Sequence, residues 1–175
     1  MVEHIKYNVL QKNNDVEIRK YPRMVVASTT NEKENAAFNL LFNYISGNNK
    51  SKQRISMTSP VITSKKIPMT SPVISKGKYM AFCLPQQYSL ETAPTPNNPN
   101  VELEIIPERI LAVLRFNGKA NEDRIKKYSQ RLKNKVNEDS LNVKDTILLF
   151  RYNSPFMPGF LRRNEVAIEL KDSKN

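Results

Sequence analysis

The sequence predicts an α+β protein: a distorted antiparallel β-barrel flanked by two α-helices and built from two pseudo-symmetric halves. Short segments alternate apolar and polar residues, as half-buried strands do. Two longer segments repeat apolar residues at three- and four-residue spacing, as helices do. The same order of elements occurs on both sides of a proline-rich link, Ala93–Pro99. For 175 residues, 39% of them hydrophobic, we expect a single domain over 1–175, with halves at about 14–92 and 100–171.

The first half opens with strands and one helix. Asp15–Tyr21 alternates charged and apolar residues, Pro22 interrupts the pattern, and Met24–Ser28 resumes as a second strand. Thr30 or Asn31 is expected to cap the helix that follows, with acidic residues in its first turn. Gly47 is expected to end this helix. Its wide apolar face consists of Ala37, Phe38, Leu41, Phe42, Tyr44 and Ile45.

A duplicated phrase then follows. Ile55–Thr63 and Ile67–Ser75 share the letters Met-Thr-Ser-Pro-Val-Ile. Their apolar pattern predicts extended chain, and each proline places it at an edge, a bulge or a bend. Two adjacent antiparallel strands and one long bent arm both satisfy the spacing. A tandem duplication of one strand and a functional role for both copies also remain open.

Gly77 offers a turn before a strand over Tyr79–Leu84, the last strand expected in the first half. The prolines of the link exclude a helix or a central strand there. The second half repeats the plan of the first. The later elements are strands at Val101–Ile106 and Ile110–Phe116, a surface helix over Ala120–Asn137, and strands at Thr146–Tyr152 and Glu165–Leu170.

Composition narrows the class of function. No apolar run is long enough for a membrane span and no signal-peptide core is evident, so we expect a cytoplasmic protein. The single cysteine, Cys83, excludes a disulfide framework and is expected to be buried. One histidine, scattered carboxylates and no glycine-rich loop give no catalytic or metal-binding pattern, so we expect no enzyme activity and no metal site.

The formal net charge of +11 is unevenly distributed. No acidic residue occurs between Asn35 and Leu90, although seven Lys and Arg residues lie there. Such a surface either keeps the protein soluble or attracts an anion, a phosphate backbone, an anionic membrane surface or the carboxylates of a cofactor. Basic residues are not interleaved with aromatic ones, so nucleic acid is not an expected partner.

One loop combines apolar and basic side chains. The loop within residues 151–166 is fixed by Pro155 and Pro158. It carries Phe156, Met157, Phe160 and Leu161, and then Arg162-Arg163. This combination suits a flat apolar ligand that bears carboxylates. The competing interpretation is that the aromatic rings close the end of the barrel while one of the arginines pairs with Glu165 or another acid.

In these and several other segments the chain resembles the SOUL, or haem-binding, protein family. The resemblance covers nearly the whole chain in the right order. It rests on Val16–Pro22, Ala37–Asn49, the twin Met-Thr-Ser-Pro-Val phrases, Leu84-Pro85 with Tyr88–Thr92, Val113–Gly118, Arg151–Pro155 and Arg162–Val166.

The resemblance implies the same fold and non-catalytic binding of haem or another tetrapyrrole in a surface apolar groove beside the first helix. The propionate partners would come from Arg162, Arg163 or the lysines around the repeats. Because no histidine lies near this helix, a strong axial ligand is not expected; Met57, Met69, Met157, a tyrosine, Cys83 and His4 are the remaining candidates. The predicted haem contacts are Phe38, Leu41, Phe42, Tyr44, Ile45, Met57, Phe156, Met157, Phe160, Arg162 and Arg163.

Two other functions compete with a haem carrier or buffer. The scaffold is also consistent with a protein-interaction module in which haem binding is weak or incidental. The fold further resembles the effector-binding domains of bacterial transcription regulators, which leaves another hydrophobic small molecule as a third possibility.

Overall fold

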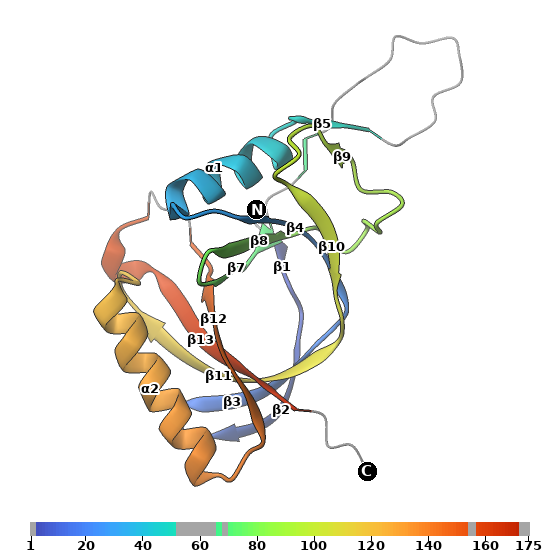
Figure 1. Ribbon diagram of the computed structural model, residues 1–175. Helices are drawn as coiled ribbons and strands as arrows, with labels where there is room; N and C mark the ends of the chain where they lie inside the picture. The colour runs from blue at the N-terminus through green and yellow to red at the C-terminus, as the bar shows by residue number, and fades with distance from the viewer. Residues whose placement is uncertain (1–2, 52–65, 68–69, 154–156, 172–175) are drawn as a thin grey trace, which may run out of the picture. The chain divides into compact units, whose positions relative to one another are not determined.

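The computed structural model describes residues 3–51, 66–67, 70–153 and 157–171 (Figure 1). The chain divides into two compact units, and neither of them is continuous in sequence. Unit 1 comprises Met1–Ile5, Met24–Val73 and Gly77–Ile106, and unit 2 comprises Lys6–Arg23, Ile74–Lys76 and Pro107–Asn175.

Unit 1 holds one helix and mostly short strands. They are β1 (Glu3–His4), β4 (Met24–Thr30), α1 (Glu34–Ile45), β5 (Asn49–Lys50), β6 (Thr70–Ser71), β8 (Tyr79–Cys83), β9 (Thr95–Pro96) and β10 (Glu102–Ile106). The strands β10, β4 and β8 lie in that order and pair antiparallel, with Val26 opposite both Glu104 and Cys83. Within the proline-rich link, the two-residue β9 pairs with β5 in a separate two-stranded sheet.

The helix α1 packs on β4 and β8, as Figure 1 shows. Its residues Leu41 and Tyr44 enter a core that also contains Ala27 and Phe82. The Tyr44 hydroxyl donates a hydrogen bond of 2.8 Å to the carbonyl of Pro94, so the buried phenol has a partner. This packing ties the C-terminal end of α1 to the segment before β9.

The sequence predicted the C-terminal end of α1 correctly but not its N-terminal cap. The helix ends as predicted at Gly47, which takes a positive φ of 120°. The predicted cap is wrong, because the N-cap residue is Lys33, whose side chain makes no capping hydrogen bond. Asn31 instead accepts a hydrogen bond from the backbone N–H of Lys33.

Unit 2 holds the longer strands and the longer helix. They are β2 (Asn8–Asn13), β3 (Val16–Tyr21), β11 (Arg109–Asn117), α2 (Glu122–Glu138), β12 (Val143–Arg151), the short 3-10 helix η1 (Gly159–Leu161) and β13 (Arg163–Leu170). The strand order is β12-β13-β11-β3-β2, all antiparallel. The strand β7 (Val73–Lys76) is divided, with Val73 in unit 1 and the rest in unit 2.

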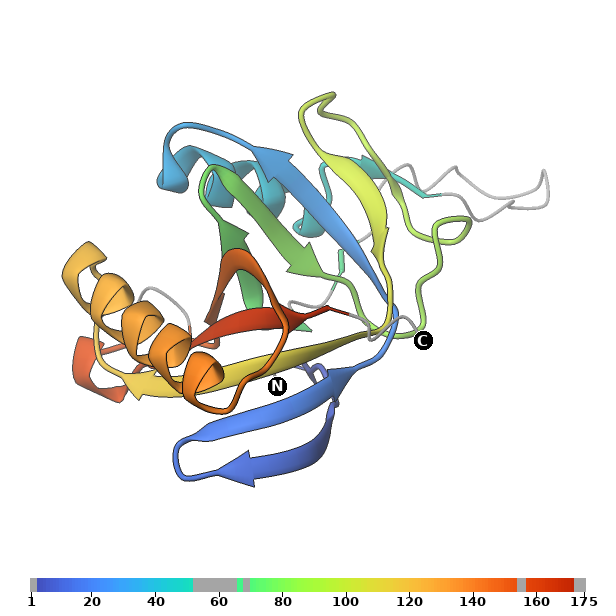
Figure 2. The same ribbon diagram turned by 60° about the horizontal axis from the view of Figure 1, so that its bottom comes forward.

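One face of the unit 2 sheet is covered by α2 (Figure 2). Leu132 and Val136 of the helix are buried against Leu114 and Val166 of the strands. The side chain of Asn121 caps the helix by accepting a hydrogen bond of 3.1 Å from the N–H of Arg124. Because side chains alternate along a strand, Glu165 points to the sheet face opposite α2.

The fold-class prediction is confirmed: the protein is α+β, with antiparallel strands and two helices. The leading strand of each predicted half lies in the other unit, since β3 pairs with β11 and β10 pairs with β4. The single domain and its half boundaries remain predictions. The first duplicated phrase lies outside the described residues, and the second covers part of β6 and β7. Neither helix is long and apolar enough to span a bilayer in the described chain.

Candidate functional site

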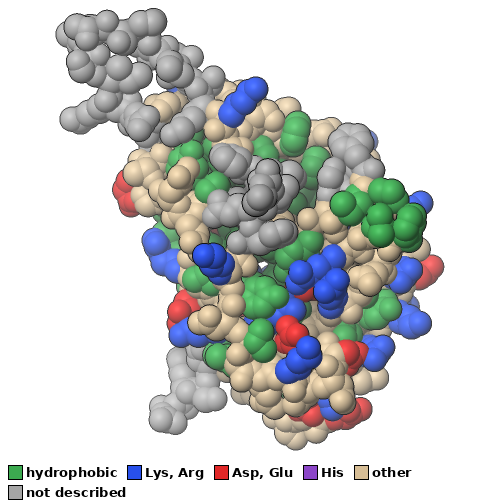
Figure 3. Space-filling view, turned by 180° about the vertical axis from the view of Figure 1, so that it is seen from behind, with side chains coloured by type: hydrophobic (Ala, Val, Ile, Leu, Met, Phe, Trp, Pro, Cys, Tyr) green, Lys and Arg blue, Asp and Glu red, His purple; other side chains and the backbone are tan. Residues whose placement is uncertain are grey.

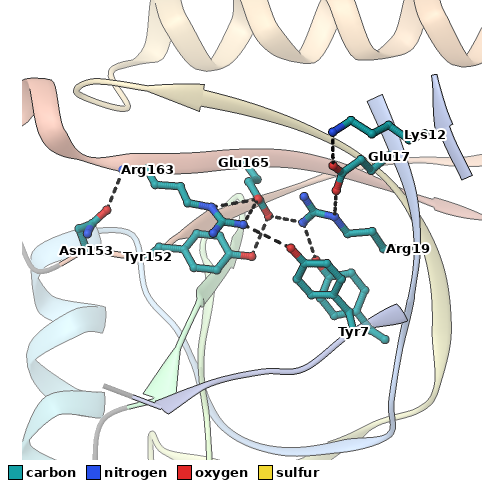
Figure 4. Close-up of polar contacts among 9 residues, drawn as sticks. Tyr7, Lys12, Glu17, Arg19, Tyr152, Asn153, Arg163 and Glu165 are labelled. Atoms are coloured by element: carbon teal, nitrogen blue, oxygen red, sulfur yellow. Dashed lines mark hydrogen bonds and ion pairs between the residues drawn. The ribbon is translucent and has the colours of Figure 1, made fainter. Parts of the chain in front are cut away.

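A cluster of charged and phenolic side chains lies on the face of the unit 2 sheet opposite α2 (Figure 4). Its centre is Glu165 on β13, which is fully buried. Arg19 on β3 is also buried, and Arg163 lies two residues before Glu165 on the same face. Three tyrosines, Tyr7, Tyr21 and Tyr152, surround these charges.

The carboxylate of Glu165 accepts a full set of hydrogen bonds. Its Oε2 accepts from Arg19 Nη1 at 2.8 Å and from the Tyr152 hydroxyl at 2.7 Å. Its Oε1 accepts from Arg163 Nη2 at 2.6 Å and from Arg163 Nε at 3.2 Å. Two guanidinium groups therefore share one buried carboxylate, which lowers the cost of keeping the three charges away from water.

The aromatic rings of the cluster complete the surroundings of the arginines. The guanidinium of Arg19 lies 4.3 Å from the ring centroid of Tyr7, and that of Arg163 lies 4.2 Å from the ring centroid of Tyr152. The Tyr21 hydroxyl accepts a hydrogen bond from Arg19 Nη1 at 3.1 Å. These are cation–π and hydrogen-bonding contacts that hold both arginines in one geometry.

The proton affinities of the cluster follow from this burial and pairing. Burial raises the pKa of Tyr21 to about 12 and also raises that of Tyr152. Burial alone would lower the pKa of Arg19, but its hydrogen bond and ion pair with Glu165 outweigh burial and raise it. For Glu17, burial acts to raise the pKa, but hydrogen bonding and charge from Arg19 at 2.8 Å bring it below the usual value.

The cluster is suited to holding structure together and not to acid–base chemistry. Both carboxylate oxygens of Glu165 are already engaged, and burial raises the pKa of Tyr21 and Tyr152, so these two phenols hold their protons at neutral pH. The cluster joins four parts of unit 2: the segment before β2, which carries Tyr7; the strand β3; Tyr152, directly after β12; and the strand β13. In the described ranges no group of three His, Cys, Asp or Glu side chains could hold a metal ion.

The predicted haem contacts of the first helix lie in unit 1. Leu41, Tyr44 and Ile45 are in the core. Phe38 is partly buried and meets Phe82 edge-on at 5.3 Å, while Phe42 stacks on Phe38 at 6.0 Å with an interplanar angle of 12°. Phe42 is 45% exposed, so it is the member of the predicted set on α1 that a surface ligand would meet most fully.

The remaining predicted contacts belong to unit 2 or lie outside the described residues. Met57 and Phe156 are in the latter group. Met157 is half-buried and Phe160 is 77% exposed. Arg162 donates through Nε to the carbonyl of Met157 at 2.8 Å, and Arg163 is engaged by Glu165. The ion pair that the sequence left as the competing interpretation is thus present, and the haem-binding role of these residues stays a prediction.

Sequence reasoning gave a pair between an arginine of the 151–166 loop and Glu165 as one alternative, but it did not anticipate the buried Arg19 or the tyrosines around this pair. Charged residues on alternating strands are normally assigned to solvent, so Glu17 and Arg19 gave no warning that Arg19 is buried. A signal was available in the pairing of polar residues at alternate positions, Glu17-Arg19-Tyr21 on one strand and Arg163-Glu165 on another.

A model of the SOUL heme-binding protein family matches residues 2–169. This chain belongs to that family. The match covers almost all of the chain, which confirms the resemblance seen in its motifs. No curated protein matches this SOUL protein by sequence.

Solved structures share the fold of this SOUL protein at low sequence identity. The crystal structure of the EcmrR C-terminal domain has a TM-score of 0.54 at 11% identity, over 94% of this chain and 98% of that one. EcmrR in its cryo-EM complex with DNA gives 0.57 at 11% identity, over 89% and 57% of the two chains. A hydrolase from Listeria innocua gives 0.59 at 11% identity, over 93% and 94%. These likenesses concern the fold alone.

Proposed function

We propose that this SOUL protein binds haem or a related tetrapyrrole without catalysing a reaction on it, as a carrier or buffer. Family membership supports a tetrapyrrole as the ligand. The proposed location of the ligand rests on the stacked rings of Phe38 and Phe42 on α1, because the Phe42 side chain is 45% exposed. A planar porphyrin can stack on such a ring and cover apolar area that is otherwise in water.

The surroundings of Phe42 suit an anionic ligand. Asn39 and Asn43 are exposed neighbours on the helix, and no acidic residue follows Glu34 in α1. Lys33 precedes the helix and Lys50 follows it shortly after, both exposed. In unit 1, these two lysines are the cations nearest in sequence to α1 that propionate groups could meet.

The described residues of α1 fit a haem held by apolar contact. The helix itself contains no His, Cys or Met. In unit 1, Cys83 is buried with its Sγ 3.7 Å from the Sδ of buried Met24. Met57 and Met69 lie outside the described residues. Haem supplies redox-active iron when bound; this chain contributes a surface for the ring.

A titration with ferric haem, followed through its Soret band, tests the proposal. We expect saturation at one haem per chain, and about tenfold weaker binding for Phe42→Ala because one aromatic contact is lost. Leu10→Ala, which truncates an exposed apolar side chain in unit 2, serves as the matched control and should bind as the unmodified protein does. A non-saturating rise in absorbance would refute haem binding as the function.

Two further arms locate the ligand and define its contacts. Iron-free protoporphyrin should bind about as tightly as haem, because the proposal gives iron no ligand from α1. Phe160→Ala distinguishes a haem site at Phe42 in unit 1 from one at Phe160 in unit 2. If Phe160→Ala loses haem binding and Phe42→Ala does not, the haem site lies in unit 2.

A further inference from the structure

The turn η1 presents two consecutive large apolar side chains to solvent. Phe160 is 77% exposed and Leu161 is 59% exposed. Single exposed apolar residues are common on protein surfaces, but an adjacent aromatic and aliphatic pair at the tip of a turn favours an interaction surface. Exposed hydrophobic side chains also gather elsewhere, between Lys and Arg, on the face drawn in Figure 3.

The backbone of unit 2 holds this turn in place. The N–H of Leu161 donates to the carbonyl of Pro158 at 3.0 Å, and the N–H of Arg162 donates to that of Gly159 at 3.2 Å. After the turn, the N–H of Arg163 donates to the Asn153 side chain at 2.7 Å. The two apolar side chains are therefore presented on a braced turn that loses little conformational entropy when it binds.

Two basic side chains from the segment around Gly118 lie beside the turn. The aliphatic part of Lys119 packs on Gly159, where an added Cβ would come within 2.7 Å of Lys119 Cγ. The guanidinium of Arg124 packs on Gly118, whose N–H donates to the carbonyl of Arg162 at 2.9 Å. Among the described side chains, Lys119 and Arg124 form no ion pair with an acidic residue.

The acidic residues closest in sequence do not cancel this charge. Glu122 and Asp123 open the first turn of α2, but Lys126 and Lys127 follow within the next turn. Residues 115–127 together contain five basic and two acidic side chains. The surroundings of the turn are thus net positive, in a chain whose net charge is +11.

We propose that Phe160, Leu161, Lys119, Arg124 and Arg162, here named the η1 surface, bind the chain peripherally to an anionic lipid membrane. The two apolar side chains enter the boundary between headgroups and acyl chains, and the basic side chains meet lipid phosphates. Leucine beside phenylalanine at a protruding tip favours a lipid boundary over nucleic acid, which offers stacking to an aromatic ring but little to an aliphatic one.

Co-sedimentation with vesicles tests this assignment on the full chain without haem. The vesicles are phosphatidylcholine with about 30% phosphatidylserine, and pure phosphatidylcholine is the neutral comparison. We expect binding to the anionic vesicles, little binding to the neutral ones, and release as salt rises. The variant F160S/L161S should bind about tenfold more weakly, and K119Q/R124Q should bind about fivefold more weakly.

A matched control separates the η1 surface from exposed apolar residues in general. Val9 and Leu10 on β2 are also adjacent, and they are 51% and 54% exposed, so V9S/L10S removes similar apolar area from the same unit. This control should bind vesicles as the unmodified chain does. Equal losses in V9S/L10S and F160S/L161S, or equal binding to neutral and anionic vesicles, would overturn the proposal.

A fluorescence measurement reports insertion directly. The chain contains no tryptophan, so Phe160→Trp introduces a single probe at the tip of the turn. Its emission should shift to shorter wavelength with anionic vesicles and should be quenched by brominated acyl chains. An unshifted emission would refute membrane binding by the η1 surface. Concentration-dependent dimers that F160S/L161S abolishes, in a chain that binds no vesicles, would also refute it and would assign the surface to another occupant.

Discussion

Arg19 and Glu165 lie 146 residues apart in the chain, yet their side chains meet at 2.8 Å with almost no access to water. This pair joins the second strand of unit 2 to its last. Breaking it leaves a buried charge with fewer partners, which costs more than the pair itself contributes to stability. The stability of unit 2 therefore depends on a contact that forms only when distant parts of the chain have folded.

Arg19→Met should lower the free energy of unfolding by about 3 kcal/mol, because Glu165 then keeps only Arg163 and Tyr152 as partners. Lys20→Met is the matched control from the next position on β3. Lys20 pairs with Glu108 at 2.7 Å, but both side chains are exposed, so the loss should stay below about 1 kcal/mol. Urea denaturation measures both, and similar losses would contradict a special role for Arg19.

The phenols of the cluster predict a loss of stability in alkali. The pKa of Tyr21 is raised from 10.0 to about 12 in the folded protein, and burial raises the pKa of Tyr152 as well. Between those pH values the unfolded chain releases phenolic protons that the folded chain keeps, so the free energy of unfolding falls as pH rises. Below the pKa of the phenols in the unfolded chain, their contribution to the free energy of unfolding is fully present.

Denaturant unfolding at several pH values between about 9 and 12 measures this loss. Tyr21→Phe has no proton to release at this position and should show a shallower decline. Its stability at neutral pH should change little beyond the lost hydrogen bond from Arg19. An unchanged alkaline slope in Tyr21→Phe would show that this phenol does not contribute.

The N-termini of the two helices predict opposite responses to substitution. Asn121 caps α2, so Asn121→Ala should lower the free energy of unfolding by about 1 kcal/mol. Lys33 stands at the N-cap of α1 without a capping bond and beside the positive end of the helix dipole, so Lys33→Asp should stabilise by about 0.5–1 kcal/mol. Thermal unfolding checks the pair; a loss of stability in Lys33→Asp would contradict the cap assignment.

Periodicity in the sequence predicted both helices, and Leu132 and Val136, which recur with the helical repeat in α2, are buried. Local pattern cannot show which side chains meet across strands distant in sequence. Arg19 appeared as a solvent-facing charge in an alternating strand, and the partner that makes its burial possible lies at the other end of the chain. The same limit applies to α1. Its apolar face includes both Leu41 and Phe42, and the sequence pattern does not show that Leu41 is buried while Phe42 is half exposed.

Leu41 and Phe42 are neighbours on α1 whose truncation should have very different costs. Leu41 has no exposed surface, so Leu41→Ala creates a cavity in unit 1 and should cost about 2–5 kcal/mol. Phe42→Ala leaves the core closed and removes a half-exposed ring stacked on Phe38, so its cost should be about 1 kcal/mol or less. Denaturant unfolding of both variants measures the difference.

The same comparison determines how a haem titration of Phe42→Ala is read. If the variant unfolds at nearly the denaturant concentration of the unmodified protein, weaker haem binding reports a lost contact with the ring and not a damaged helix. A cost for Phe42→Ala as large as that for Leu41→Ala would show that the ring supports the core. Weaker haem binding by Phe42→Ala would then no longer identify the ring as a contact of the ligand.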